Sequence, residues 1–287
     1  MLNVALPVAF AVFIWWFSTG IVLLLDGLPR TTFRWSHLLS SMLALGAFVG
    51  LAHTAAQTTP AGAFCAFTCA LLVWGWHELS FLTGWVTGPR TQAESSGASG
   101  VRRFVQAVQT ILWHELAIAA SGLVIVALTW GASNQVGTQT FLVLWAMRIS
   151  AKLNIFLGVR NLSIELLPPH LKYLGSYFRR RSMNLLFPLA VAAATAVAVL
   201  VVQGALAAPA GSASAIGSFL VATLLVLAIV EHWLLVLPIN AAALWRWAMH
   251  KPPQDSASAP QATHSAIPPL RAVVVPSPTD EKLLHAR

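Results

Sequence analysis

Seven separate stretches of the sequence are each long and apolar enough to cross a lipid bilayer as an α-helix. A spanning helix needs about 20 predominantly apolar residues. The stretches cover roughly residues 4–25, 35–56, 61–86, 104–130, 138–158, 184–206 and 216–247. The sequence therefore predicts an all-α fold over residues 1–249, a polytopic membrane helix bundle with about seven transmembrane helices.

The low charge content excludes a water-soluble domain. Only 9% of the 287 residues are charged, whereas soluble proteins contain about 25%. Lys and Arg number 17 against 9 Asp and Glu, which gives a formal net charge of +8. In a soluble protein such a surplus would suggest a nucleic-acid partner. Here membrane topology explains it, so we predict the lipid bilayer as a partner and no nucleic acid.

The basic residues outside the predicted helices fall in alternate connections. They occupy the first, third and fifth connections and the segment after the last helix. The second, fourth and sixth connections, around residues 56–62, 131–139 and 207–213, contain no charged side chain. By the positive-inside rule, the N-terminus is predicted to be periplasmic and the C-terminus cytoplasmic. We expect a multi-pass protein of the bacterial inner membrane, either cytoplasmic or intracytoplasmic.

The composition changes after the last predicted span. Residues 250–287 mix seven prolines with Ser, Ala, Gln and scattered charges. Such a segment cannot bury enough apolar surface to offset the entropy lost on ordering. We therefore predict a disordered cytoplasmic tail over residues 250–287.

The most unusual residues in the predicted spans are three adjacent pairs of His and Glu, each with a Trp beside it. They occur in the third, fourth and seventh spans: His77 and Glu78, His114 and Glu115, and Glu231 and His232. Ionised side chains within a bilayer are costly, and they usually face the bundle interior and mark a site or a pathway. Counted from the predicted cytoplasmic helix ends, His77 and His114 lie about 15 Å deep, and Glu231 lies at a similar or slightly greater depth. We expect them to share one layer.

The fifth predicted span supplies possible counter-charges for these glutamates. Arg148 and Lys152 lie one helical turn apart, with Asn154 beyond them. The segment that follows carries Glu165 and His170. We predict that these five residues form a polar network with the His and Glu pairs.

Three interpretations of this layer remain open. In the first, the glutamates pair with the basic residues and the histidines only to fix helix packing. In the second, the layer binds a cofactor, because imidazole and carboxylate are ligands for iron, zinc and the magnesium of chlorophylls. All six residues of the pairs are then candidate cofactor-binding residues, and the candidate metal ligands are His77, His114, His232, Glu115 and Glu231. The third interpretation is a proton or ion pathway.

The fifth connection predicts an amphipathic helix in the cytoplasmic interface. Its apolar and aromatic residues recur at helical spacing, and three arginines follow them. A face rich in Tyr and Arg also suits a docking surface for another protein. The candidate partner-binding residues are Tyr173, Tyr177, Arg179, Arg180 and Arg181.

The same region carries a specific resemblance to a known family. It resembles the PuhE family in residues 152–159, in Asn161, Leu162 and Glu165, and in residues 167–174 and 176–178. The two Trp-His-Glu-Leu tetrapeptides, at 76–79 and 113–116, and Glu231-His232 are similar to that family as well. The resemblance covers about residues 5–250. It implies an integral membrane protein of bacteriochlorophyll-based phototrophs, acting in pigment supply or in assembly of the photosynthetic apparatus.

Together these features predict a non-catalytic assembly or regulatory factor. It would hold or sense a magnesium tetrapyrrole, such as a bacteriochlorophyll precursor, or a metal ion in the His and Glu layer. Its expected partners are reaction-centre and light-harvesting proteins or enzymes of bacteriochlorophyll biosynthesis. One alternative is a membrane metalloenzyme of the oxygenase type that acts on a tetrapyrrole or carotenoid. The other is a proton-coupled transporter.

Overall fold

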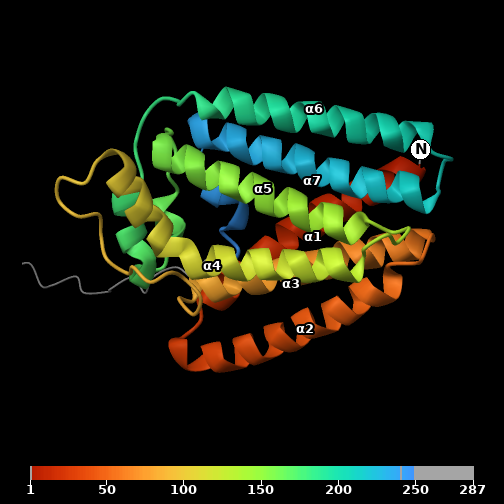
Figure 1. Ribbon diagram of the computed structural model, residues 1–287, viewed down its shortest axis with the longest axis horizontal. Helices are drawn as coiled ribbons and strands as arrows, with labels where there is room; N and C mark the ends of the chain where they lie inside the picture. The colour runs from red at the N-terminus through yellow and green to blue at the C-terminus, as the bar shows by residue number, and fades with distance from the viewer. Residues whose placement is uncertain (1, 240, 249–287) are drawn as a thin grey trace, which may run out of the picture. The chain divides into compact units, whose positions relative to one another are not determined.

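The structure is a computed structural model that describes residues 2–239 and 241–248. Seven long α-helices follow one another in this part of the chain (Figure 1): α1 (Leu2–Asp26), α2 (Phe33–Thr54), α3 (Pro60–Leu82), α4 (Gly100–Leu128), α5 (Val136–Leu157), α6 (Leu186–Ala207) and α7 (Ala213–Val236). Four short 3₁₀ helices lie between or after them: η1 (Arg30–Thr32), η2 (Ile164–Leu166), η3 (Pro169–Tyr177) and η4 (Ala241–Trp245). All seven α-helices are long and apolar enough to cross a membrane. This confirms the predicted all-α bundle.

The connections between successive helices gather at two ends of the bundle. The long connections 83–99 and 158–185 lie at the end opposite to the start of the chain (Figure 1). We call this end, with connections 27–32, 83–99 and 158–185 and the segment 237–248, the basic end. The other connections, 55–59, 129–135 and 208–212, contain no charged residue. The assignment of the basic end to the cytoplasm stays a prediction of the positive-inside rule.

Helices α3 and α7 form the centre of the bundle. Most residues of both spans are buried, with α2 packed on α3 and α6 packed on α7 (Figure 1). The core includes Phe67, Ile118, Phe141 and Leu220, all of which are buried from the surface. Because lipid tails are as apolar as these side chains, close packing and polar contacts must hold the helices together.

Small residues bring α2 close to α3. A Cβ atom at Gly50 would lie 2.6 Å from the Sγ atom of Cys69, so this position has no room for a side chain. The other glycine of the Gly-x-x-x-Gly spacing, Gly46, faces open space. Cys65 and Cys69 are free thiols whose sulfur atoms lie 3.9 Å apart. Of the two glycines in this spacing, only Gly50 therefore contributes to the close contact between α2 and α3.

One asparagine ties three helices together at the uncharged end. The Nδ2 atom of Asn134 donates to the backbone oxygens of Thr54 and Gly62, both at 3.1 Å. Its Oδ1 atom accepts from the backbone N–H of Val136 at 3.2 Å. Two of these bonds satisfy backbone groups without a helical partner, the oxygen of Thr54 at the end of α2 and the N–H of Val136 at the start of α5. The bond to Gly62 adds the first turn of α3.

Helix α3 ends earlier than the sequence analysis predicted. Its last residue is Leu82 rather than residue 86, because Gly84 has a φ of +81° and reverses the chain. The backbone N–H of Gly84 returns to the oxygen of Phe81 at 2.9 Å. A glycine with positive φ just after a helix is the usual helix-ending conformation. His77 therefore lies about 8 Å from the end of its helix, not about 15 Å.

Helix α7 ends eleven residues before the predicted limit of 247. It stops at Val236, two residues before Pro238, a residue that cannot continue a helix. Asn161 then satisfies the freed carbonyl groups: its Nδ2 atom donates to the oxygen of Leu234 at 2.7 Å and also contacts the oxygen of Leu237. Glu231 consequently lies five residues from the helix end, about 8 Å, where the longer predicted span placed it about fifteen residues from the end.

The segment after α7 folds back onto α1. The rings of Trp245 and Trp15 meet edge to face with centroids 5.6 Å apart, and Trp247 lies 5.3 Å from Trp16. The Nε1 atom of Trp245 donates to the backbone oxygen of Trp16 at 3.2 Å. The predicted disordered tail, residues 250–287, lies outside the described residues.

Candidate functional site

Two ion pairs join α3, α4 and α5 within the bundle. Arg148 of α5 binds Glu78 of α3 through two bonds, Nε to Oε1 at 3.2 Å and Nη2 to Oε2 at 2.9 Å. Lys152 of α5 binds Glu115 of α4, with Nζ and Oε1 2.5 Å apart. We call these four residues the charge cluster. Because Arg148 and Lys152 lie one turn apart on α5, one face of that helix holds both neighbouring helices.

An indole strengthens the second pair. The Nε1 atom of Trp145 donates to Oε2 of Glu115 at 3.1 Å, so both carboxylate oxygens have a donor. Trp145 lies one turn before Arg148 on the same face of α5. The carboxylate of Glu115 is thus fully engaged by side chains of α5.

The third glutamate is held differently. Oε1 of Glu231 accepts a bond from Nε1 of Trp15 at 3.1 Å, which joins α7 to α1. Within the described part of the chain, Glu231 has no salt bridge, whereas Glu78 and Glu115 each have one. Of the three carboxylates in the predicted layer, two therefore pair with a cation and the third is bound by an indole.

The three histidines fall into two groups. His77 and His114 are neighbours, with ring centroids 6.4 Å apart. Nε2 of His77 lies 2.9 Å from the hydroxyl of Ser121, while Nδ1 of each ring is buried without a hydrogen-bond partner in the described residues. His232 has both ring nitrogens engaged: Nδ1 donates to the oxygen of Ala228 at 2.8 Å, and Nε2 lies 2.9 Å from the hydroxyl of Ser150.

The predicted ligands do not assemble into a compact metal-ion site. In residues 2–239 and 241–248, no group of three or more His, Cys, Asp or Glu side chains is arranged to hold a metal ion. Glu78 and Glu115 are bound to cations instead, and His232 is bound to Ser150. The buried Nδ1 atoms of His77 and His114 are the ring nitrogens that this arrangement leaves without a partner.

The other predicted members of the polar network lie near the basic end. Asn154 is fully buried and accepts a bond from Nδ2 of Asn184 at 3.0 Å, which anchors the segment before α6. Glu165 is exposed. His170 donates from Nε2 to the backbone oxygen of Leu82 at 2.8 Å, and burial lowers the pKa of its imidazole. Asn154 and His170 therefore bond the connections, and none of the three residues joins the charge cluster.

The predicted amphipathic helix forms as the 3₁₀ helix η3. Leu171, Leu174 and Tyr177 are buried at a spacing of three, which matches the three residues per turn of a 3₁₀ helix. Leu171 and Leu174 pack on Phe81 of α3. Tyr173 is half-buried, and burial raises the pKa of its phenol. The buried face of η3 is therefore directed at the bundle.

The arginines that follow η3 remain exposed. The backbone of Val159 pairs with this segment, donating to the oxygen of Arg179 at 3.1 Å and accepting from the N–H of Arg181 at 3.1 Å. Arg180 forms the β-bridge partner of Val159. Tyr177 is buried, so of the predicted partner-binding residues the three arginines are the ones fully available at the surface.

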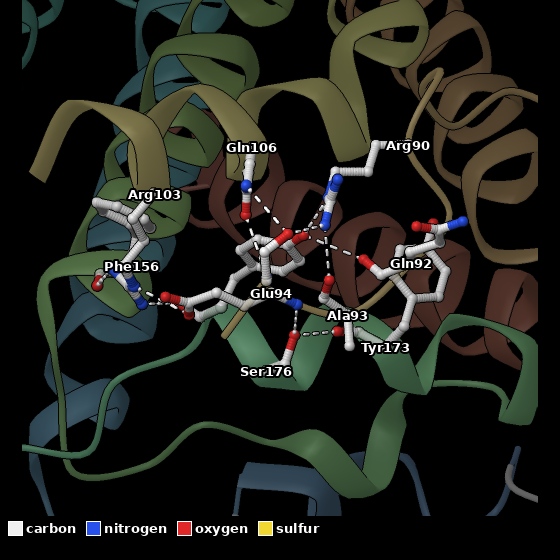
Figure 2. Close-up of polar contacts among 11 residues, drawn as sticks. Arg90, Gln92, Ala93, Glu94, Arg103, Gln106, Phe156, Tyr173 and Ser176 are labelled. Carbon is white, nitrogen blue, oxygen red and sulfur yellow. Dashed lines mark hydrogen bonds and ion pairs between the residues drawn. The ribbon is translucent and has the colours of Figure 1, made fainter. Parts of the chain in front are cut away.

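A buried arginine that the sequence analysis did not single out organises the basic end (Figure 2). Arg103 of α4 donates from Nε to Oε2 of Glu94 at 3.1 Å and from Nη1 to the oxygen of Phe156 at 3.4 Å, and it also bonds the oxygen of Tyr177. Its guanidinium lies 4.1 Å from the ring centroid of Phe156. One side chain thereby joins the third connection, α5 and η3.

A second arginine completes this arrangement. Nε of Arg90 donates to the hydroxyl of Tyr177 at 2.6 Å, and that hydroxyl donates to the oxygen of Gln92 at 3.0 Å. Nη2 of Arg90 reaches the oxygen of Ala93 at 2.8 Å (Figure 2). Sequence spacing gives no signal for these bonds, because Arg90 and Tyr177 are 87 residues apart.

The third connection also touches the backbone of α4 beside His114. The N–H of His114 donates to the oxygen of Thr87 at 2.9 Å, and the N–H of Arg90 donates to the oxygen of Gln109 at 3.3 Å. A Cβ atom at Gly88 would lie 2.1 Å from the Gln109 oxygen. Only glycine allows this contact, so Gly88 helps to position His114.

Replacing Gly88 with Ala should destabilise the protein by about 1–3 kcal/mol. The added methyl group meets backbone atoms, which cannot rotate away as a flexible side chain would. The measurement is the thermal unfolding midpoint in detergent. Gly75→Ala is the matched control, because a Cβ atom there meets nothing within 4 Å. Equal midpoints for the two variants would contradict the close contact.

Comparison with known proteins identifies relatives of the whole bundle. The family described as Protein of unknown function (DUF3623) matches residues 1–256. The chain is also 37% identical over 242 residues to the uncharacterized 30.4 kDa protein in the puhA 5′ region of Rhodobacter capsulatus. That alignment covers 83% of this chain and 88% of the relative. No solved structure matches the chain. The two matches confirm the resemblance to the PuhE family.

Proposed function

The chain belongs to the DUF3623 family, and we propose that it is a non-catalytic assembly or regulatory factor for photosynthetic complexes in a bacterial inner membrane. The position of its relative, in the puhA 5′ region of Rhodobacter capsulatus, supports a link to photosynthesis. Seven candidate spans support a site of action within the bilayer.

The observation that carries the proposal is the accessibility of Arg148. Its side chain is 44% exposed although it lies in the middle of α5, and its Nη1 atom has no hydrogen bond in the described residues. A charged group within a bilayer usually faces the bundle interior or a partner. An exposed arginine in the middle of a candidate span indicates that a second molecule covers its side chain.

The candidate for this second molecule is a magnesium tetrapyrrole. Its central metal accepts one imidazole nitrogen, for which His77 and His114 are the candidates because each has an unpartnered buried Nδ1 atom. Its carboxylate side chains pair well with a guanidinium, here that of Arg148. A single axial ligand does not require the cluster of three ligands that a bare metal ion needs.

The exposed arginines at the basic end supply the proposed docking surface. Arg179, Arg180 and Arg181 are held next to Val159 by backbone pairing. We assign them to contact with reaction-centre and light-harvesting proteins or with enzymes of bacteriochlorophyll biosynthesis. Arg is enriched at such protein interfaces.

The test of the ligand is the absorption spectrum of the protein purified in mild detergent from pigmented cells. We expect a tetrapyrrole band that is lost in His77→Phe or His114→Phe. His53→Asn is the control, because His53 is exposed on α2 away from the cluster. A colourless, metal-free wild-type protein that still supports photosynthetic growth would overturn the ligand site.

Deletion of the gene separates an assembly factor from the alternatives. An assembly factor predicts loss of pigment–protein complexes with a normal profile of pigment precursors. Accumulation of one unmodified precursor, with iron at a fixed ratio in the purified protein, would favour an oxygenase-type metalloenzyme instead. A pH-dependent flux that Glu115→Gln or Glu231→Gln abolishes would favour a proton-coupled transporter.

A further inference from the structure

A small cavity at the basic end combines an acid from the end of α1, an arginine from the connection that follows it and a histidine from the distant connection 158–185. It encloses about 270 Å³, and its lining includes Asp26, Arg30, Pro168, Pro169 and His170. This is smaller than the roughly 300–1,000 Å³ of pockets that enclose drug-sized ligands. The cavity lies where α1 ends, outside the charge cluster, and has no part in the proposed function.

The carboxylate of Asp26 lacks a counter-charge. Asp26 is the last residue of α1, and the last turn of α1 contains no basic residue. The carbonyl end of a helix is electrically negative, so a carboxylate there is unfavourable unless a cation lies nearby. In the described residues Asp26 has no salt bridge, and its Oδ1 atom is buried without a hydrogen-bond donor. This end of the cavity therefore favours a cation.

The other groups in the cavity give it a second, opposite preference. Arg30 is exposed and lines the cavity, and a guanidinium binds phosphate well. His170 uses Nε2–H to bond the oxygen of Leu82, so Nδ1 of the neutral ring is an acceptor and adds no positive charge. The cavity thus offers an acidic side for an ammonium group and one arginine for a phosphate.

We propose that this cavity binds a phosphoethanolamine group, as carried by the headgroup of phosphatidylethanolamine, with the ammonium beside Asp26 and the phosphate at Arg30. The location supports a lipid as the source, because the cavity opens where the spans end and the membrane interface begins. Leu28 and Phe33 add apolar lining beside the polar groups, where the glycerol and upper acyl chains would lie.

The experiment is native mass spectrometry of the delipidated full chain titrated with phosphatidylethanolamine or phosphatidylglycerol of identical acyl chains. We expect the wild type to prefer phosphatidylethanolamine by about tenfold, the effect of one charge-assisted hydrogen bond. Asp26→Asn should remove this preference while leaving phosphatidylglycerol binding unchanged. Arg30→Gln should weaken the binding of both lipids, because both carry a phosphate.

The control is Arg34→Gln, an exposed arginine outside the cavity that lies 5.2 Å from the ring of Trp35. It should behave as the wild type. Equal binding of the two lipids to the wild type, or an unchanged preference in Asp26→Asn, would overturn the proposal. Misfolding of the variant would not explain a lost preference, because Asn has nearly the same size and shape as Asp. Asp26→Asn should keep the unfolding midpoint of the lipid-free protein or raise it.

A competition experiment shows whether the phosphoethanolamine group comes from a lipid or from a soluble molecule. Failure of free phosphoethanolamine to displace the lipid supports a membrane lipid as the ligand, and displacement at comparable concentration overturns that source in favour of a soluble one. Pigment content, the readout for the charge cluster, should be unchanged in Asp26→Asn. The two proposals therefore fail separately.

Discussion

Replacing Arg148 with Met should destabilise the bundle by about 3–5 kcal/mol, because it leaves the carboxylate of Glu78 without its cation. Glu78 is only 14% exposed, and its two oxygens bond Arg148 at 3.2 and 2.9 Å. Arg148 is itself 44% exposed, so the buried member of the pair that loses its partner is Glu78. For a domain of this size the loss corresponds to roughly 6–20 °C in the unfolding midpoint.

The double variant Arg148→Met with Glu78→Gln should recover most of this loss. With both charges removed, no ion is left unpaired in the apolar interior, and replacing a whole buried pair is often close to neutral. The measurement is the unfolding midpoint in lipid nanodiscs for the wild type, both single variants and the double variant. A double variant as unstable as the sum of the single variants would show that the two residues do not act as a pair.

Glu115→Gln gives a smaller effect that tests the same principle. Gln keeps one carbonyl acceptor, and its amide nitrogen cannot accept, so one of the two donors, Trp145 Nε1 or Lys152 Nζ, loses its bond while the charge of Lys152 loses its counter-ion. The helix contacts themselves would persist. Each variant therefore leaves one ion unpaired, Glu78 in Arg148→Met and Lys152 in Glu115→Gln, so the two substitutions test the two ion pairs separately.

The number and order of the helices followed from the sequence because apolar length is a local property. The ends of α3 and α7 were misjudged although their signals are present in the sequence, namely Gly84 and Pro238. Both residues lie inside stretches that remain apolar beyond them. A mean hydropathy taken over such a stretch does not register a single residue that ends the helix. Local backbone chemistry therefore decides where these helices end.

The individual contacts of the site could not be predicted to the same extent. The sequence shows that Arg148 and Lys152 are the cations nearest the glutamates in depth, but not that Glu78 binds Arg148 and Glu115 binds Lys152. That choice depends on how α3, α4 and α5 are rotated. The bond of His232 to Ser150 was likewise not predicted, because Ser150 lies in no distinguishing sequence pattern.

The basic end shows the same limit most clearly. Arg103 looked like a cytoplasmic flanking charge, since its neighbours in sequence are exposed and its partners Phe156 and Tyr177 are 53 and 74 residues away. A cation in the first turn of a helix is also unfavourable with respect to the helix dipole. Only the tertiary contacts explain why α4 begins with this residue buried.

Arg103→Gln should therefore open the basic end. The substitution leaves Glu94 without its cation and removes donors from the backbone oxygens of Phe156 and Tyr177. Because the arginine side chain is only 4% exposed, we expect a loss of about 3 kcal/mol, the lower part of the range for breaking a buried pair, since Glu94 keeps some access to water. The connections 83–99 and 158–185 should separate before the spans unfold.

Limited proteolysis measures this opening directly. In nanodiscs, a protease should cut Arg103→Gln within residues 83–99 at least about tenfold faster than the wild type. A decrease of about 1.4 kcal/mol in the free energy of local opening gives this ratio when the cleavage rate follows the population of the open state. Arg102→Gln is the matched control, because Arg102 is the adjacent arginine and is exposed. If both variants were cut at the wild-type rate, the contacts of Arg103 would contribute nothing to holding the third connection, and Gly88 with Arg90 would have to hold it alone.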